Sequence, residues 1–284
     1  MRRRIRSQLW LPVPYLQYIS QSSKSAKIEM ACADDKRRKV SVLTVGDGDF
    51  SCSLALLRAY DVTCDSETPL STPQIIRLVA TTLLPNEHAL LQLYPSASNT
   101  VRQLHEHQCC TIVYGVDATK LCDDFRFSQL SFDYILFHHP HLGYNGAMIT
   151  PSEHNQRHRQ LLASYFASAR HLLTKMSDIS YLHVCLCGKE RTRWDLDGIL
   201  AEGGLQLVHV QPASRPIFDH TQPQTAKLSR TRRGHWLGRH GYCHQPTDPQ
   251  TTHFSTNVST SHHYFIRESL PAEATGCTSS ASES

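Results

Sequence analysis

The chain has 284 residues, a formal net charge of +4, 40% hydrophobic residues and 19% charged residues. This is the composition of an ordinary soluble globular protein, and the length is enough to bury a full α/β core in a single domain. No apolar run approaches the roughly 18–20 residues that a membrane-spanning helix requires, so a helical membrane protein is excluded and no membrane partner is expected.

The first 39 residues carry ten basic residues and only three acidic ones, and we expect a disordered or leader segment there. No acid precedes Glu29, which is typical of mitochondrial transit peptides, although Pro12 and Pro14 interrupt a helix in this segment. The ten cysteines of the chain form no CxxC pair, which favours free thiols in a reducing compartment.

From Val40 onward, segments with strand patterns alternate with segments that have helical apolar periodicity. Strands separated by helices imply a mostly parallel sheet covered on both faces, which is a Rossmann-like, doubly wound α/β domain. We expect one such domain over residues 40–267. Strands are predicted at 40–45, 75–81, 110–114, 132–137, 179–187, 205–210 and 261–267, and helices at 50–59, 87–94, 97–108, 152–175 and 194–201.

The pattern loosens over residues 212–252, which are rich in Pro, His, Arg and Gly and are interpreted as a long functional loop. Residues 268–284 are small and polar, and we expect a disordered tail. The loop contains a basic stretch without acids, which suits a polyanion such as RNA, although basic residues that are merely solvated are an equally good interpretation. The predicted RNA-binding residues are Lys227, Arg230, Arg232, Arg233 and Arg239.

A glycine-rich turn, Gly46-Asp47-Gly48-Asp49-Phe50-Ser51, directly follows the first strand and opens the first helix. In a doubly wound sheet, ligands bind beyond the carboxyl ends of the strands, and this turn approaches them closely. Asp47 and Asp49 would repel a pyrophosphate, whereas S-adenosylmethionine carries a sulfonium and an ammonium group. The turn therefore favours S-adenosylmethionine as cofactor, and the alternative is a plain Gly-Asp turn without a ligand.

Two further loops follow the third and fourth strands. Asp117 and Ala118 lie after the third strand, where Asp117 could accept a hydrogen bond from an adenine amino group or simply cap a helix. The fourth strand ends in His138-His139-Pro140-His141, whose imidazoles offer a general base or a stacking surface for a nucleobase.

A metal site is not predicted, because no spacing among the histidines and cysteines matches a structural zinc module. A zinc site formed by His183, Cys185, Cys187 and residues 240–244 is the alternative, and Cys185 and Cys187 are otherwise expected to pack on one face of a strand.

Taken in order, several blocks of the sequence resemble the eukaryotic 25S rRNA (uridine-N(3))-methyltransferase-like Rossmann domain family. The resemblance covers roughly residues 40–267, and although each block is weak alone, their common order is specific. The blocks are GDGDFSCSLAL, RLVATTL, YPSASNTVRQL, YGVDATKL, FDYILFHHPHLG, HNQRHRQLLASYFASARHLL and YLHVCLCGKERTRWDL.

The resemblance implies a class I S-adenosylmethionine-dependent methyltransferase domain that methylates N3 of a uridine in RNA, with ribosomal RNA as partner. The cofactor residues would be Gly46–Ser51 together with Asp117 and Ala118. The family's FNFPH-type loop would correspond to Phe137 and to the predicted catalytic residues His138, His139, Pro140 and His141, and a basic aromatic segment would correspond loosely to Arg232–Tyr242.

The chain departs from the family pattern at two places. His138 and His139 stand where relatives have Asn and Phe, and Leu83-Leu84 stands where an acid often binds the ribose hydroxyls. These departures favour a rival interpretation, a non-catalytic RNA-binding or ribosome-assembly factor on a methyltransferase fold. A nicotinamide-dependent oxidoreductase would need a fuller glycine-rich turn and an acid after the second strand. The resemblance implies the nucleolus or cytoplasm as location, and the basic leader makes the mitochondrion the alternative.

Overall fold

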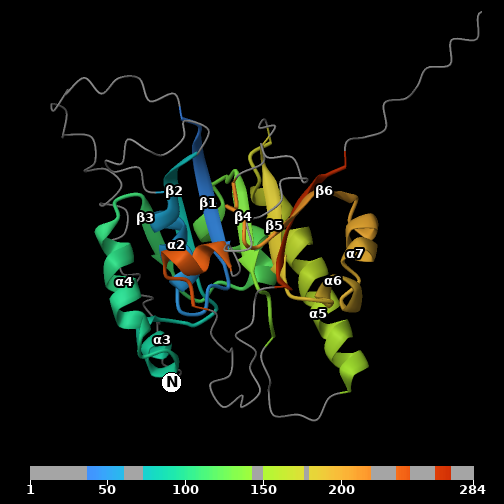
Figure 1. Cartoon of the computed structure of the whole chain (residues 1–284), viewed down its shortest axis with the longest axis horizontal. Coiled ribbons are helices and arrows are strands. Elements are labelled where there is room, and N and C mark those ends of the chain that lie inside the picture. Colours follow the sequence, from blue (N-terminus) through green and yellow to red (C-terminus); the bar gives the residue numbers. More distant parts are fainter. Residues whose placement is uncertain are drawn as a thin grey trace, which may run out of the picture. The chain divides into compact units, whose positions relative to one another are not determined.

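Seven strands form one sheet in the order β3-β2-β1-β4-β5-β7-β6 in the computed structural model (Figure 1). The structure describes residues 37–60, 73–142, 150–175, 179–218, 235–243 and 260–269. Strands β1 to β5 run parallel to one another, and β7 runs antiparallel between β5 and β6. The strands are β1 (Lys39–Val45), β2 (Gln74–Thr81), β3 (Cys110–Val113), β4 (Tyr134–His138), β5 (Tyr181–Leu186), β6 (Leu205–Pro212) and β7 (His262–Glu268).

Helices cover both faces of this sheet (Figure 1). Successive side chains of β1 point to opposite faces, so Val40 and Val42 pack in one apolar cluster while Leu43 and Val45 pack in the other. The first cluster includes residues of α2 (Ser51–Tyr60), α3 (Glu87–Leu93) and α4 (Ala97–Glu106), and the second those of α5 (Pro151–Ala169) and α7 (Leu196–Glu202). Strands buried on both faces confirm the predicted doubly wound, mostly parallel sheet.

The predicted elements agree with the observed ones to within about two residues at every end but one, and the structure explains three of the differences. The predicted helix 152–175 leaves α-helical geometry at Ala169 and ends in the 3-10 turn η3 (Arg170–Leu172). The predicted helix 194–201 begins later, as α7, because the left-handed Asp195 separates it from the short α6 (Glu190–Arg193) and caps it. The predicted strand at 132–137 begins only at Tyr134.

The 3-10 turns η2 (Phe125–Phe127) and η4 (Trp236–His240) were not expected from the sequence, and η1 (Ala118–Asp123) was expected only through the alternative that Asp117 caps a helix. Such short turns leave no 3.6-residue periodicity to detect. The turn η4 lies within the predicted loop 212–252 and packs on α2. Residues 1–36 and 270–284 lie outside the described residues, so the leader and the tail remain predictions. In the part of the chain that is described, no helix has the length and apolar character needed to span a bilayer.

Candidate functional site

A pocket opens where the carboxyl ends of β1 and β4 lie side by side. The space within it, together with open solvent at its mouth, amounts to about 430 Å³. Two of the three predicted loops meet there: the glycine-rich turn after β1 and the histidine loop after β4. The residues that line the pocket are Gly46, Asp47, Gly48, Asp49, Cys52, Tyr94, His138, His139, Tyr242 and Cys243.

The glycine-rich turn is held in place by its backbone and by close packing. Gly46 has a φ of +64°, and a Cβ at this position would lie 2.7 Å from Phe137 Cε2, so a side chain here meets both strain and a ring. Asp47 N donates a hydrogen bond of 3.0 Å to Thr81 O, which fastens the turn to the end of β2. The turn therefore presents its backbone to the pocket at the place where a doubly wound sheet binds its ligand.

Two buried carboxylates lie in this turn. Asp47 Oδ2 accepts hydrogen bonds from Ser53 N (2.7 Å) and Ser53 Oγ (2.6 Å), and Asp49 Oδ1 accepts one from Ser51 N (3.0 Å). Burial, and next the charge of Asp49, raise the pKa of Asp47 to about 7, and burial raises the pKa of Asp49. Within the described residues, neither carboxylate forms an ion pair with a lysine, arginine or histidine. The pocket wall thus carries an acidic pair that can receive a cationic ligand.

The third predicted loop lies beside the pocket and does not line it. Val116 N donates to Thr82 O (3.0 Å), so this loop flanks the end of β2 on the side opposite the glycine-rich turn. Asp117 caps η1, since its Oδ1 accepts from Thr119 N (2.9 Å) and Thr119 Oγ1 (2.7 Å). The cap role expected as an alternative is thus present. The adenine contact of Asp117 and Ala118 stays a prediction.

The predicted catalytic histidines separate into two environments. His138, the last residue of β4, is 9% exposed, and His138 and His139 both line the pocket. His141 is exposed and does not line it; its ring lies 4.6 Å from the ring of His158, centroid to centroid. Pro140 is buried between the two. Of the imidazoles in this loop, the first two therefore face the proposed reaction site.

The segment 235–243 closes one side of the pocket, which the sequence did not predict. Ser51 Oγ donates to Cys243 O (3.3 Å), and Arg58 Nη1 donates to His240 O (3.2 Å), so the segment is fastened to α2. Tyr242 packs against His138 with ring centroids 4.9 Å apart, and burial raises its pKa well above the usual value. Only the loose family pattern over Arg232–Tyr242 pointed to this segment; nothing in the local sequence marks Tyr94 or Cys52.

The predicted RNA-binding residues can be placed only in part. Arg239 lies in η4 with an exposed side chain, on the segment that borders the pocket. Lys227, Arg230, Arg232 and Arg233 lie outside the described residues.

This chain is similar in sequence to two mammalian proteins. It is 29% identical over 185 residues to human (Homo sapiens) ferredoxin-fold anticodon-binding domain-containing protein 1 and 26% identical over 186 residues to the mouse (Mus musculus) homolog; each match covers 61% of this chain. The match spans about a quarter, 26%, of the length of each relative. Among solved structures, a 16S rRNA (adenine(1408)-N(1))-methyltransferase from Catenulisporales acidiphilia is 11% identical, with a TM-score of 0.40, over 84% of this chain and 91% of that one.

A family model described as rRNA (uridine-N3-)-methyltransferase BTM5-like matches residues 43–221. The match begins in β1 and includes all seven blocks that carry the resemblance, among them the glycine-rich turn, the Asp117 loop and the histidine loop. It covers more than half of the chain. The chain belongs to the rRNA (uridine-N3-)-methyltransferase BTM5-like family.

Proposed function

We propose that this chain is an S-adenosylmethionine-dependent RNA methyltransferase that methylates N3 of a uridine in ribosomal RNA. The observation that carries the proposal is the buried acidic pair, Asp47 and Asp49, at the carboxyl end of β1 beside the histidine loop. Family membership implies the methyl donor and the class of reaction.

The residues present fit this cofactor by charge. S-adenosylmethionine carries a sulfonium and an ammonium group, and a cation complements two buried carboxylates that lack an ion-pair partner among the described residues. Gly46 and Gly48 would let the methionine part approach the backbone, and Asp117 would lie toward the adenine at the far side of β2. When bound, the cofactor supplies a methyl carbon whose bond to sulfur breaks, the electron pair remaining on sulfur, as the lone pair of uridine N3 forms the new bond.

The protein's share of catalysis would be mainly orientation of the base against the donor. Uridine N3 lies on the base-pairing edge, so the target nucleotide has to be unpaired or flipped out of a duplex. His139 and Tyr242 offer ring faces at the pocket for such a base, with an interplanar angle of 10°. That His138 or His141 accepts the N3 proton stays a prediction, and its position at the pocket favours His138.

The basic residues of the 212–252 loop would hold the phosphates of the RNA, and Arg239 is on the segment that borders the pocket. As location we propose the nucleolus or cytoplasm, where ribosomal RNA is made and used, with the mitochondrion as alternative.

The decisive test compares ribosomal RNA nucleosides by mass spectrometry from cells with and without the protein. Loss of 3-methyluridine on deletion, restored by the wild-type chain and not by the Asp49→Asn variant, supports the proposal. Unchanged 3-methyluridine contradicts it. An exposed substitution, Asp123→Asn, serves as matched control and should restore the modification.

One observation favours the rival role of a non-catalytic RNA-binding or assembly factor. Leu83, at the end of β2 where an acid often binds the cofactor ribose, is 68% exposed. Calorimetry with S-adenosylmethionine separates the two roles, because a scaffold protein would show no saturable binding while it still bound RNA.

A further inference from the structure

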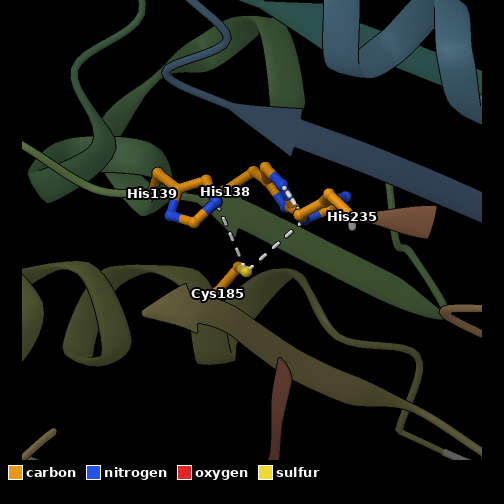
Figure 2. A group of neighbouring side chains, drawn as sticks. All are labelled: His138, His139, Cys185 and His235. Atoms are coloured by element: carbon orange, nitrogen blue, oxygen red, sulfur yellow. Dashed lines mark hydrogen bonds between the residues drawn. The ribbon is translucent and has the colours of Figure 1, made fainter. Parts of the chain in front are cut away.

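Three imidazoles and one thiol converge at the carboxyl ends of β4 and β5. They come from separate parts of the chain: His138 and His139 from the end of β4, Cys185 from β5, and His235 from the residue before η4 (Figure 2). One ligand atom from each residue can be chosen so that all four atoms lie within 4.8 Å of one another.

The sheet explains why these side chains meet. His138 pairs with Cys185 in the parallel register of β4 and β5, which puts both side chains on the same face of the sheet. A continued strand would turn His139 to the opposite face. Instead, His139 has a φ of +50° and donates its backbone N–H to Cys185 O at 3.1 Å, and its ring returns to the side of Cys185.

Three of the six distances between the ligand atoms are close to the edges of a tetrahedron around a metal ion. His138 Nε2 lies 3.1 Å from His235 Nε2, and Cys185 Sγ lies 3.6 Å from His139 Nε2 and 3.9 Å from His235 Nε2. Ideal tetrahedral zinc bonds give N···N edges of about 3.3 Å and N···S edges of about 3.6 Å. We propose that His138, His139, Cys185 and His235 bind one zinc-class divalent metal ion.

The surroundings support a buried metal site. Cys185 is fully buried and His235 is 6% exposed, and three neutral imidazoles with one thiolate suit a borderline-soft ion such as Zn²⁺. The other ring nitrogen of His139, Nδ1, lies 3.4 Å from Cys187 Sγ, which in turn lies 3.1 Å from Ser261 Oγ. Such outer partners orient a metal-bound imidazole and fix which nitrogen faces the ion.

Four protein ligands leave no open coordination position, so the site would be structural. The ion would clamp segment 235–243, which supplies Tyr242 and Cys243 to the pocket, onto the sheet. It would also occupy the ring nitrogen of His138, so another group would have to accept the uridine proton. The proposal does not depend on methyl transfer, because it concerns these four side chains alone.

The test measures metal on the full-length chain, purified without chelators. We expect about one equivalent of zinc by elemental analysis, and in the cobalt-substituted protein a thiolate-to-cobalt charge-transfer band with intense tetrahedral ligand-field bands. A chain that retains no zinc, binds no added zinc or cobalt, or shows cobalt without the thiolate band overturns the proposal, and this holds without any variant.

Variants then assign the ligands. Cys185→Ser should abolish the thiolate band, and His235→Ala should weaken zinc binding at least tenfold in competition with a chelating dye. Cys110→Ser in β3 and His154→Ala in α5 are the matched controls, with unchanged binding. If His154→Ala removes the metal while Cys185→Ser keeps it, the ion belongs to the second histidine group of the described residues, His141, His154 and His158, and the assignment is wrong.

A structural reporter checks the same site in the wild-type chain. Leu237 N donates a hydrogen bond of 3.2 Å to His235 Nδ1. A ring that binds metal through Nε2 carries its proton on Nδ1, so the ion should displace the Leu237 amide resonance in an NMR titration with zinc. An unmoved Leu237 resonance at saturating zinc excludes His235 as a ligand.

Discussion

Asp47 and Ser53 are joined by two hydrogen bonds at the start of α2, from Ser53 N (2.7 Å) and from Ser53 Oγ (2.6 Å) to the same carboxylate oxygen. The carboxylate thereby caps the helix that the glycine-rich turn opens, and the same residue lines the pocket. One buried side chain therefore links the stability of the fold to the charge of the proposed cofactor site.

The first prediction concerns stability and pH. Because burial raises the pKa of Asp47 to about 7, the folded chain keeps a proton that the unfolded chain releases above its ordinary pKa of 3.8. The protonated Asp47 therefore stabilises the folded chain fully below pH 4. This contribution falls by up to about 4 kcal/mol in total as the pH rises to about 7, and it is absent above that pH. Urea unfolding from pH 4 to 8 should show a steeper fall for wild type than for Asp47→Asn. Parallel profiles would show that Asp47 titrates normally.

The second prediction concerns cofactor affinity and pH. A cationic ligand binds the ionised carboxylate more tightly, so affinity for S-adenosylmethionine should rise from pH 6 to pH 8. S-adenosylhomocysteine lacks the sulfonium charge and should show a smaller rise. In Asp47→Asn, both ligands should lose most of the dependence. Calorimetry at three pH values measures the affinity for each ligand. An equal pH dependence for the two ligands would place the sulfonium away from Asp47 and Asp49.

The third prediction compares two glycines with nearly the same backbone conformation. Gly46 and Gly204 have φ values of +64° and +63°, but a Cβ at Gly204 meets nothing within 4 Å, whereas at Gly46 it meets the Phe137 ring. Both alanine variants should lose about 1 kcal/mol of unfolding free energy from backbone strain, and Gly46→Ala should lose more because its Cβ meets the buried Phe137 ring. Only Gly46→Ala should also weaken S-adenosylmethionine binding, at least tenfold. Equal affinity in both variants would refute the proposed pocket.

The fourth prediction concerns RNA. Replacing the five predicted RNA-binding residues, Lys227, Arg230, Arg232, Arg233 and Arg239, by Ser should weaken RNA binding, because fewer phosphates are neutralised. The slope of log K against log salt should fall by about 0.7 for each phosphate of a single strand that the variant no longer neutralises. Filter binding at several salt concentrations measures this. A control in which Arg102, Lys120 and Arg157 are replaced should keep the slope of log K against log salt. If this control weakens RNA binding as much as the loop variant does, the interaction is only a general effect of net charge.

Much of the fold could be predicted because its strands and helices follow from local patterns in the sequence. The short apolar, β-branched run of β1 and the apolar stripe of α5 each lie within one segment, so the sequence alone identifies both elements. The short turn η4 has no such period and was missed. The N-cap role of Asp117 is also local, since its partner Thr119 is two residues away, and it was foreseen as an alternative.

The sequence by itself determined the order of strands and helices, the family, and the two loops that face each other across β1 and β4, since each depends on neighbours along the chain. Only the tertiary structure decided that His138 lies beside His235, 97 residues away, and beside Cys185 on the next strand. No spacing along the chain encodes that meeting, because strand register and a left-handed residue at His139 produce it. Likewise, Tyr242 lines the pocket because segment 235–243 packs on α2, a contact that no local sequence pattern indicates.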